Sequence, residues 1–381
     1  MKVLQVSTFF TEHGGVERSV ADLSSALAVE HDVSVLCTRK GESTRDSFNG
    51  IDVTAAGGQI TLSGRPLAMN FPIELSARSV DVVHYHLPCP IAVVSQFAFA
   101  PKAKIKVATW HHDLVRHKLF NQLLGPANDR FLNTLDRIIV TAPALIENTP
   151  LLKRYAHKCT VIPLGVRNER FEKIDLDEVQ RVRAEHGTPL ILYVGRLVYY
   201  KGCEILLRAI AQVPGSRLIM VGTGPLEQRL HEQIAEHGLS DRVKLLGWQS
   251  ESQIKTLFQA CDIFVLPSTL ETECFGLAQV EAMLCGKPIV NTDLPTGVPW
   301  VSVHGETGLT VTPGDSTGLA QAIQLLVDDG QLRKRLGNNA RKRALSMFTL
   351  EQHLSATLSL YDELLQRQRP AVRTTGSAAR R

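Results

Sequence analysis

The sequence predicts an α/β protein in which two doubly wound parallel sheets face each other across a cleft. Short apolar segments typical of strands alternate along the chain with amphipathic segments typical of helices. The alternation occurs in two sets, separated by a polar and charged stretch at 167–188. With 381 residues, 44% of them hydrophobic, the chain is long enough for two domains, each with its own core.

Each set contains six predicted strands. In the first set they lie near residues 3–6, 33–37, 80–84, 107–110, 138–140 and 161–163. In the second set they lie near residues 190, 218, 243, 263, 288 and 309, with helices such as 203–212 and 227–237 between them. Three amphipathic helices, at 319–327, 331–347 and 350–366, follow the last strand.

These patterns place an N-terminal domain at 1–166, a linker at 167–188 and a C-terminal domain at 189–348. A helix at 349–367 and a tail at 368–381 follow. The tail is rich in arginine and has no acidic residue, so we expect it to be disordered.

Composition excludes several classes of protein. No apolar run approaches the roughly 20 residues that span a bilayer, and the first residues resemble a strand and not a signal peptide, so we expect a cytoplasmic or membrane-peripheral protein. A net charge of +4 is too small to indicate nucleic acid. Basic clusters at 102–106, 116–118, 333–335 and 341–343 suggest contact with anionic lipid, or else solvated helix faces. The seven cysteines form no Cys-x-x-Cys pair and are expected to be reduced core residues.

Two glutamates, Glu273 and Glu281, flank a Phe-Gly pair at the point where a predicted strand is followed by a helix. The first turn of that helix offers the backbone amides of Phe275, Gly276 and Leu277 to phosphate oxygens. The two carboxylates lie on either side of this turn, so one can reach a sugar and the other a ribose. An ordinary acidic surface helix is the alternative, since glutamate is a good helix former.

A pair of cations, Arg196 and Lys201, follows the apolar strand that ends at Val194. Arginine offers a planar fork to phosphate, and lysine adds a point charge on a flexible stem. Two surface cations on a loop are the alternative. The functional interpretation gains from the glutamate pair, because both pairs lie at strand ends of one α/β unit, where open parallel sheets bind ligands.

Several glycine-rich and charged motifs occur along the chain in one order. They are Gly14-Gly15-Val-Glu-Arg18, Thr109-Trp-His111-His-Asp113, Ile162-Pro-Leu-Gly165, Gly195-Arg196 with Lys201-Gly202, Val221-Gly-Thr-Gly224, the glutamate pair, and Gly305-Glu-Thr-Gly308 with Pro313-Gly-Asp315. In this order they resemble family 4 of the retaining glycosyltransferases, which have the GT-B fold of two Rossmann-like domains. The chain looks most like bacterial mannosyl- and rhamnosyltransferases that build polysaccharide O-chains.

The resemblance implies transfer of a hexose from a nucleotide diphosphate sugar to a glycan or lipid-linked acceptor. Arg196 and Lys201 would then stabilise the leaving diphosphate, Glu273 would bind hexose hydroxyls and Glu281 the ribose. The remaining donor contacts would come from the helix amides near Phe275 and from Gly14, Gly15, Gly195, Gly222, Gly224 and Trp248. Guanine with mannose or a deoxymannose is the expected donor, and a UDP-sugar is the alternative.

Histidines at strand ends complete the expected site. By resemblance, His111 lies near the anomeric carbon of the sugar, and His112 competes for that role. Neighbouring strand residues point to opposite faces, so only one of the two can enter the cleft directly, and His111 is favoured. Asp113, His84 and His86 are expected on the acceptor side.

No cofactor is expected, and transfer is predicted to be independent of metal. Asp175-Leu-Asp177 has the Asp-x-Asp form of metal-dependent glycosyltransferases, but its position in the polar stretch favours a helix cap instead.

Other enzyme classes share this fold. A dinucleotide-dependent oxidoreductase is disfavoured, because no Gly-x-Gly-x-x-Gly follows the first strand. A sugar phosphorylase, a nucleotide-sugar epimerase or a non-catalytic partner subunit remains open on fold alone.

Overall fold

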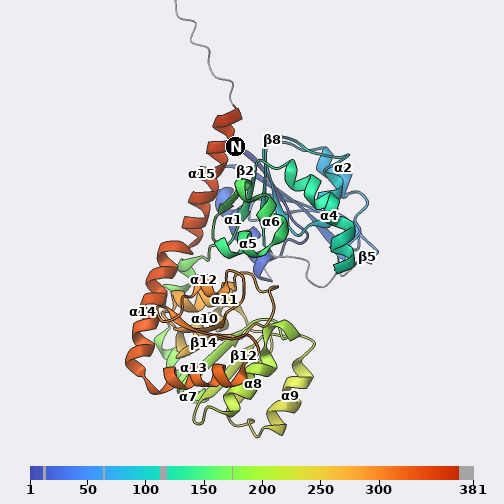
Figure 1. The fold of residues 1–381 in the computed structure, drawn as a ribbon. Coiled ribbons are helices and arrows are strands. Elements are labelled where there is room, and N and C mark those ends of the chain that lie inside the picture. The colour runs from blue at the N-terminus through green and yellow to red at the C-terminus, as the bar shows by residue number, and fades with distance from the viewer. Residues whose placement is uncertain (12–13, 63–64, 112–117, 174, 369–381) are drawn as a thin grey trace, which may run out of the picture.

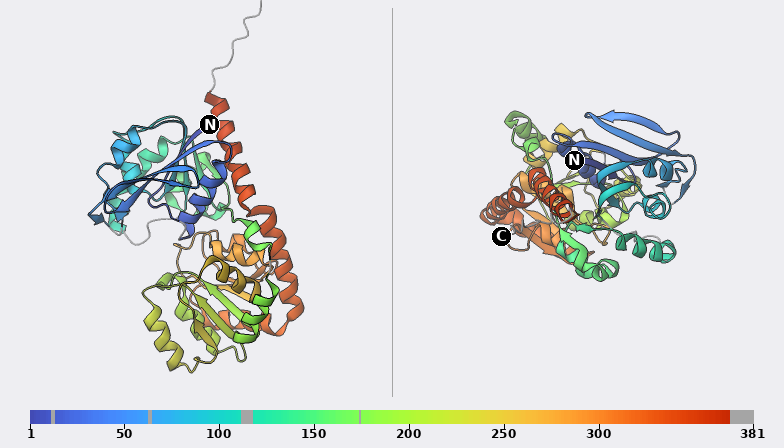
Figure 2. Two further views of the ribbon diagram at one scale, coloured as in Figure 1. Left: turned by 180° about the vertical axis from the view of Figure 1, so that it is seen from behind. Right: turned by 90° about the horizontal axis from the view of Figure 1, so that it is seen from above.

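The computed structural model describes residues 1–11, 14–62, 65–111, 118–173 and 175–368. The chain forms two α/β domains, one above the other in Figure 1, and the helices α14 and α15 run along one side of both. Figure 2 shows from behind that the last helix, α15, crosses from the second domain back to the first. Among the described helices, none is both long and apolar enough to cross a membrane.

The N-terminal domain contains an eight-stranded sheet in the order β10-β9-β8-β7-β1-β2-β4-β3. The strands are β1 (Lys2–Val6), β2 (Asp32–Lys40), β3 (Thr44–Phe48), β4 (Ile51–Gly58), β7 (Ser79–Leu87), β8 (Lys102–Trp110), β9 (Arg137–Val140) and β10 (Cys159–Val161). All neighbours are parallel except β3, which pairs antiparallel with β4 at the edge. The small strands β5 (Thr61–Leu62) and β6 (Arg65–Pro66) form a separate ribbon.

Helices cover both faces of this sheet, as a doubly wound topology requires. Apolar side chains of α1 (Gly15–Leu27) and of α15 (Leu350–Gln368) pack on one face. The other face is covered by α2 (Phe71–Ser76), α3 (Pro90–Ser95), α4 (Lys118–Asn133), α5 (Pro143–Asn148) and α6 (Pro150–Arg154).

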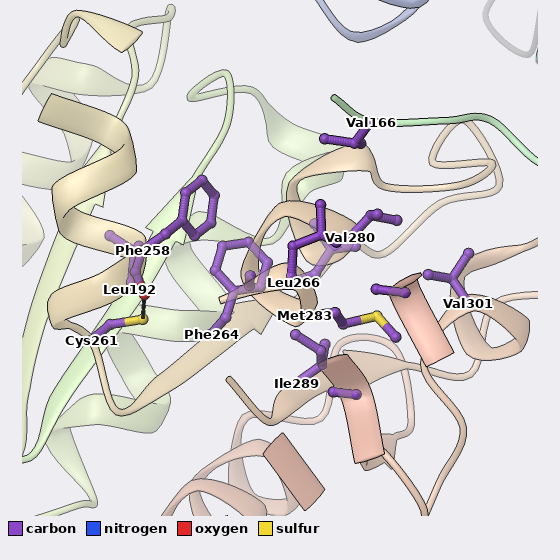
Figure 3. Close-up of a cluster of buried hydrophobic side chains, with 14 of the residues drawn as sticks. Val166, Leu192, Phe258, Cys261, Phe264, Leu266, Val280, Met283, Ile289 and Val301 are labelled. Atoms are coloured by element: carbon purple, nitrogen blue, oxygen red, sulfur yellow. Dashed lines mark hydrogen bonds between the residues drawn. The ribbon is translucent and has the colours of Figure 1, made fainter. Parts of the chain in front are cut away.

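The C-terminal domain contains a parallel six-stranded sheet in the order β13-β12-β11-β14-β15-β16. Its strands are β11 (Leu190–Val194), β12 (Arg217–Val221), β13 (Val243–Leu245), β14 (Ile263–Leu266), β15 (Ile289–Thr292) and β16 (Gly308–Val311). One face packs on α8 (Cys203–Ala211), α9 (Glu227–Glu236) and α13 (Ser316–Asp328). The other packs on α10 (Glu251–Ala260), α11 (Leu277–Leu284), α12 (Val298–Val301) and α14 (Gly330–Met347), and Figure 3 shows the buried side chains there.

All twelve predicted strands are present, but the β3–β4 hairpin was not predicted. Its first strand, Thr44–Phe48, is polar and mostly exposed, so it has no apolar pattern to detect. The turn was the available signal. Asn49-Gly50 has positive φ at both residues, 50° and 80°, as a tight hairpin turn requires.

The segment predicted as a linker, 167–188, is mostly structured and belongs to the C-terminal domain. It contains a 3₁₀ turn, η2 (Asn168–Phe171), and the helix α7 (Leu176–His186), which packs against α10. Arg183 of this helix donates to Asp262, at 3.1 Å. The expected cap is confirmed, since the Asp175 carboxylate accepts from the backbone N–H of Glu178 at 3.0 Å. The segment has a polar sequence because α7 has no fully buried residue.

The chain passes between the domains twice, and the two passages lie side by side. Val166 donates its backbone N–H to Phe348 and accepts from Leu350, each at 2.9 Å. A Cβ atom at Gly165 would lie within 2.6 Å of the Thr349 carbonyl oxygen, so only glycine permits this approach. From there α15 packs along α1 and β8.

Candidate active site

The carboxyl ends of the two sheets face each other across the domain interface. The turn after β1 leads through Gly14 and Gly15 into α1, and a Cβ atom at Gly15 would lie 3.8 Å from Leu277, at the start of α11 in the other domain. Nearby, Gly297 of the C-terminal domain approaches Ala142 of the N-terminal domain, with 2.8 Å between its ideal Cβ position and the alanine Cβ. Ligands of open α/β sheets bind at such strand ends.

Lys201 and Glu273 form a buried ion pair at the carboxyl ends of the neighbouring strands β11 and β14. The ammonium of Lys201 donates to the Glu273 carboxylate, and the Ser268 hydroxyl donates to the same oxygen at 2.9 Å. Burial lowers the pKa of Lys201, but the charge of Glu273 raises it and the net shift is upward, so the lysine stays protonated.

Glycine makes this pair possible. Lys201 ends the short turn η3 (Tyr199–Lys201), and Gly202 follows in the left-handed conformation, with φ of 69°. A Cβ atom at Gly202 would collide with the carbonyl oxygen of Pro267, which follows β14. The lysine loop can therefore lie against the end of β14 only because residue 202 has no side chain.

The other predicted cation, Arg196, lies on the same loop with its side chain exposed. Its carbonyl oxygen accepts from the buried Tyr193 hydroxyl at 2.9 Å, which fixes the backbone of the loop. One cation of the pair is thus held in an ion pair, and the guanidinium of the other is open to solvent.

Three glycine loops lie against each other beside this pair. A Cβ atom at Gly222 would collide with the carbonyl oxygen of Gly195, and one at Gly224 would collide with that of Leu197. Gly222 also donates its N–H to Gly247, at 2.8 Å, and Trp248 follows with two-thirds of its surface exposed. The predicted donor residues of three separate motifs are therefore neighbours.

The helix α11 begins at Gly276, which has φ of 73°. The Phe275 ring is buried and packs edge-on against Phe348, with ring centroids 5.7 Å apart, so its side chain serves the core while its backbone lies at the helix N-terminus. The helix begins three residues after Glu273, whose carboxylate holds Lys201, and its first-turn amides and positive dipole end suit an anion.

Glu281, in the second turn of α11, has an ion partner in the other domain. The Arg18 guanidinium lies 3.3 Å from its carboxylate and 3.6 Å from that of Glu251. Burial raises the pKa of Glu281, against the opposing charges of Arg18 and Arg170. Sequence reasoning missed Arg18 as a site residue. Its signal was its place at the end of the Gly14-Gly15-Val-Glu-Arg18 motif, which opens α1.

These ion pairs belong to an interdomain charge network of six residues. Arg170 lies 3.1 Å from both Asp22 and Glu251, and Arg167 lies 2.7 Å from Asp22. The members of the network are Arg18, Asp22, Arg167, Arg170, Glu251 and Glu281. Glu281 is therefore tied to the N-terminal domain through Arg18, which also reaches Glu251.

His111 follows β8 directly and is 4% exposed. The expectation that His84 and His86 face an acceptor is wrong, because both lie inside β7 and both ring nitrogens of each are bonded to buried neighbouring side chains. His84 bonds to Thr109 and to Tyr361 of α15, and His86 bonds to His111. The apolar strand before them continues through both histidines, so the predicted strand end came too early. His112 and Asp113 lie outside the described residues.

Within the described ranges, no group of three or more His, Cys, Asp and Glu side chains is arranged to hold a metal ion. Asp175 of the Asp-x-Asp pattern is the N-cap of α7.

Two family models match the chain. One, described as Glycosyltransferase Family 4, matches residues 13–170, and the other, Glycosyl transferases group 1, matches residues 176–343.

Two curated proteins are similar to it along most of their length. The chain is 32% identical over 291 residues to the D-rhamnosyltransferase WbpZ of Pseudomonas aeruginosa, which covers 76% of each protein. It is 32% identical over 375 residues to the O-antigen chain mannosyltransferase C of Escherichia coli, with 96% of this chain and 99% of that protein covered.

Solved structures show the same fold. The Anabaena protein Alr3699/HepE, in complex with UDP and glucose, superposes with a TM-score of 0.78 at 24% identity, covering 95% of this chain and all of that one. A sucrose-phosphate synthase from Thermosynechococcus elongatus superposes with a TM-score of 0.80 at 22% identity, covering 96% and 99%.

The raised pKa of Glu281 predicts how stability depends on pH. A carboxyl group whose pKa is raised by folding stabilises the folded state below its ordinary pKa, and this contribution is lost as pH rises through the raised value. We expect Glu281→Gln to increase the free energy of unfolding at pH 7, with the gain disappearing below about pH 4. Urea denaturation at several pH values measures this.

Glu251→Gln is the matched control, because Glu251 also faces Arg18 but its side chain is 60% exposed, against 12% for Glu281. It should change the unfolding free energy little at any pH. A Glu281→Gln protein that is less stable than wild type at pH 7 would show that the ion pair with Arg18 outweighs the cost of burial.

Proposed function

The chain belongs to the glycosyltransferases, with a family 4 N-terminal half and a group 1 C-terminal half on the GT-B fold, and from this premise we propose that it transfers a hexose, with retention, from a nucleotide diphosphate sugar to a glycan or lipid-linked acceptor. The observation that carries the proposal is the buried Lys201–Glu273 pair beside the exposed Arg196 and the N-terminus of α11.

Breaking the bond between the anomeric carbon and the phosphate oxygen leaves negative charge on the diphosphate and positive character on the sugar ring. Arg196, Lys201 and the α11 amides supply positive charge and N–H donors on the diphosphate side. Glu273 accepts hydrogen bonds from hexose hydroxyls and orients the ring. The acceptor oxygen bonds to the anomeric carbon on the same face from which the leaving group departs. Its proton passes to the departing phosphate oxygen.

A covalent intermediate on Glu273 is disfavoured. One oxygen of its carboxylate, Oε2, already accepts from the Lys201 ammonium and the Ser268 hydroxyl, and two such bonds lower the nucleophilicity of the carboxylate as a whole. The same bonds suit a carboxylate that holds its position during the reaction.

The donor is proposed to be a GDP-sugar carrying mannose or a deoxymannose, in the synthesis of a cell-surface polysaccharide such as an O-antigen. The support comes from the names of similar proteins, a rhamnosyltransferase and an O-antigen mannosyltransferase. A UDP-sugar is the second candidate, because a structural neighbour binds UDP.

A lipid-linked acceptor would require the enzyme to work at a membrane surface, and one face of the N-terminal domain suits that contact. Exposed apolar side chains gather on and around the adjoining helices α2 and α3. Figure 1 shows α2 at the edge of the N-terminal domain. Met69 is 85% exposed and Ile73 63%. The Arg130 guanidinium lies 4.9 Å from the centre of the Phe97 ring, which places a cation within the apolar patch.

Incubation with GDP-mannose and a lipid-linked glycan from a polysaccharide-producing bacterium tests the function. We expect release of GDP only when the acceptor is present, and an α-linked product from the α-linked donor by NMR. If nucleotide is released in the presence of acceptor from a UDP-sugar but not from GDP-mannose, the second donor is the correct one. A sugar phosphate product would instead indicate a phosphorylase.

The two glutamates should have separable kinetic effects. Glu273→Gln should lower kcat roughly 10²-fold with nucleotide affinity near wild type, because the hexose contact strengthens as the ring flattens. Glu281→Ala should mainly raise the donor KM, at a cost of about 1.5–3 kcal/mol for a lost charged hydrogen bond. Steady-state kinetics and nucleotide titration measure both.

Glu271→Gln is the control for these variants, since Glu271 is exposed two residues before Glu273. Its kinetic constants should match wild type. Identical behaviour of Glu273→Gln and Glu281→Ala would refute the assignment of sugar to one and ribose to the other.

Transfer should continue in excess EDTA, because Arg196 and Lys201 supply the positive charge at the diphosphate. The initial rate is measured after chelation, and again after Mg²⁺ or Mn²⁺ has been added back in excess of the EDTA. Loss of activity that either metal restores would contradict this account of the leaving group.

Membrane contact predicts that full-length protein binds vesicles containing anionic lipid and that salt weakens the binding. Replacing Met69 and Ile73 together by serine should reduce vesicle affinity by roughly tenfold or more, since burying either side chain is worth about 1.5–3 kcal/mol. Val29→Ser, an equally exposed position away from this face, is the control. If vesicle affinity changes neither with the content of anionic lipid nor with the double substitution, the proposed membrane contact is wrong.

A further inference from the structure

A row of polar side chains lies inside the N-terminal sheet, on the face that α1 and α15 cover. The strand register pairs Gln5 of β1 with His84 of β7, and His86 of β7 with Thr109 of β8, so these four side chains point to the same face. His111, two residues after Thr109, continues the row. We call Gln5, His84, His86, Thr109 and His111 the polar ladder.

The ladder replaces an apolar core at one end of this face. The residues two positions earlier on the same strands, Val3, Val82 and Val107, belong to the hydrophobic cluster there. At the carboxyl ends the pattern changes to glutamine, histidine and threonine, all buried. Buried polar groups cost free energy unless they are hydrogen-bonded, so packing alone would favour more valine here.

Hydrogen bonds run from strand to strand towards His111. His86 Nε2 lies 2.7 Å from Gln5 Oε1, and His86 Nδ1 lies 3.0 Å from His111 Nε2. The rings of His86 and His111 are also stacked, with centroids 5.3 Å apart and planes at 25°. His84 stacks on the other side of His86, at 4.4 Å, but its own hydrogen bonds go to Thr109 and Tyr361.

The order of donors and acceptors follows from charge and chemistry. Burial holds the pKa of His86 well below its usual value, with the neighbouring histidines lowering it further, so its ring is neutral and carries one N–H. The amide oxygen of Gln5 can only accept, which places that proton on Nε2 of His86. Nδ1 of His86 is then an acceptor, and Nε2 of His111 must be the donor to it.

We propose that His86 is a positioning residue for His111: through Gln5 and its own Nδ1 lone pair it holds His111 as the Nε2-protonated tautomer and fixes the plane of its ring. A neutral histidine has two tautomers and a rotatable ring, and the partner of one nitrogen decides what the other can do. With Nε2 donating to His86, Nδ1 of His111 is the acceptor side of the ring.

The inference rests on the proposed role of His111 beside the sugar, since only there does the choice of tautomer affect transfer. The Nδ1 acceptor suits a sugar hydroxyl as donor. Gln5 and His86 would then act on the reaction only through His111.

NMR of the full-length protein labelled with ¹⁵N in its histidine rings tests the proposal without any substrate. The ring resonances of His111 are assigned by their loss in His111→Gln. We expect the Nε2–H tautomer in wild type and in His86→Asn, whose amide oxygen can occupy the place of Nδ1. We expect a mixture of tautomers in His86→Leu.

His84→Asn is the matched control, because His84 is equally buried and two residues away but does not bond to His111. It should leave the His111 resonances unchanged. Should His86→Leu not fold, Gln5→Leu removes the group that fixes the proton on His86 and should give the same mixture. A wild-type His111 protonated on Nδ1, or a tautomer that survives both leucine variants, overturns the proposal.

Kinetics connect the tautomer to the reaction. Loss of one neutral hydrogen bond corresponds to roughly 3- to 10-fold, so His86→Leu should lower kcat by that factor with the donor KM unchanged, and His86→Asn should restore it. If His111→Gln is fully active while the NMR shows the expected tautomers of His111, the proposed role of His111 beside the sugar is wrong, but the positioning of His111 by His86 is supported. If His111→Gln is inactive while His86→Leu keeps the wild-type tautomer of His111 and the wild-type kcat, the positioning of His111 by His86 is refuted, but the role of His111 in transfer is supported.

Discussion

The buried ion pair of Lys201 and Glu273 is the constraint on which the rest of the site depends. A buried charge is tolerated only with a partner, so each residue requires the other, and the two come from loops 72 residues apart in the sequence. Their meeting requires the glycine at 202 and the adjacency of β11 and β14, and the Ser268 hydroxyl adds a second donor to Glu273. The positions of Arg196 and of the α11 N-terminus follow, since Arg196 shares a loop with the lysine and α11 follows the glutamate.

The fold and the C-terminal half of the site could be predicted from sequence because their signals are local. Apolar strands that end in glycine and charged residues indicate both the sheet and the edge of it where the candidate site lies, as at Gly195 and Glu273. The β3 edge strand was harder, because an exposed strand has no apolar pattern, whereas α7 was indicated by the cap at Asp175. The turn at Asn49-Gly50 was the one local signal for the hairpin.

Features formed between distant segments could not be predicted in this way. Arg18 and Glu281 are 263 residues apart and meet only when the domains face each other. His84 and His86 follow an apolar run and therefore resemble a strand end. Their burial depends on Tyr361 of the last helix and on Gln5 of the first strand, and nothing within β7 itself indicates either contact.

The paired passages at Val166 and Thr349 determine which relative motions of the domains cost little. Two crossings far apart would allow the domains to slide or to twist about either strand, but here a pair of backbone hydrogen bonds joins them into one narrow ribbon. Rotation about an axis through this ribbon leaves both bonds intact, whereas translation or shear breaks them. The easy coordinate is a single opening angle about this ribbon, and an opening that parts the domains also has to break the interdomain ion pair of Arg18 and Glu281. Under the proposed function, a nucleotide bound at Glu281 would compete with that ion pair and so act on the same opening angle.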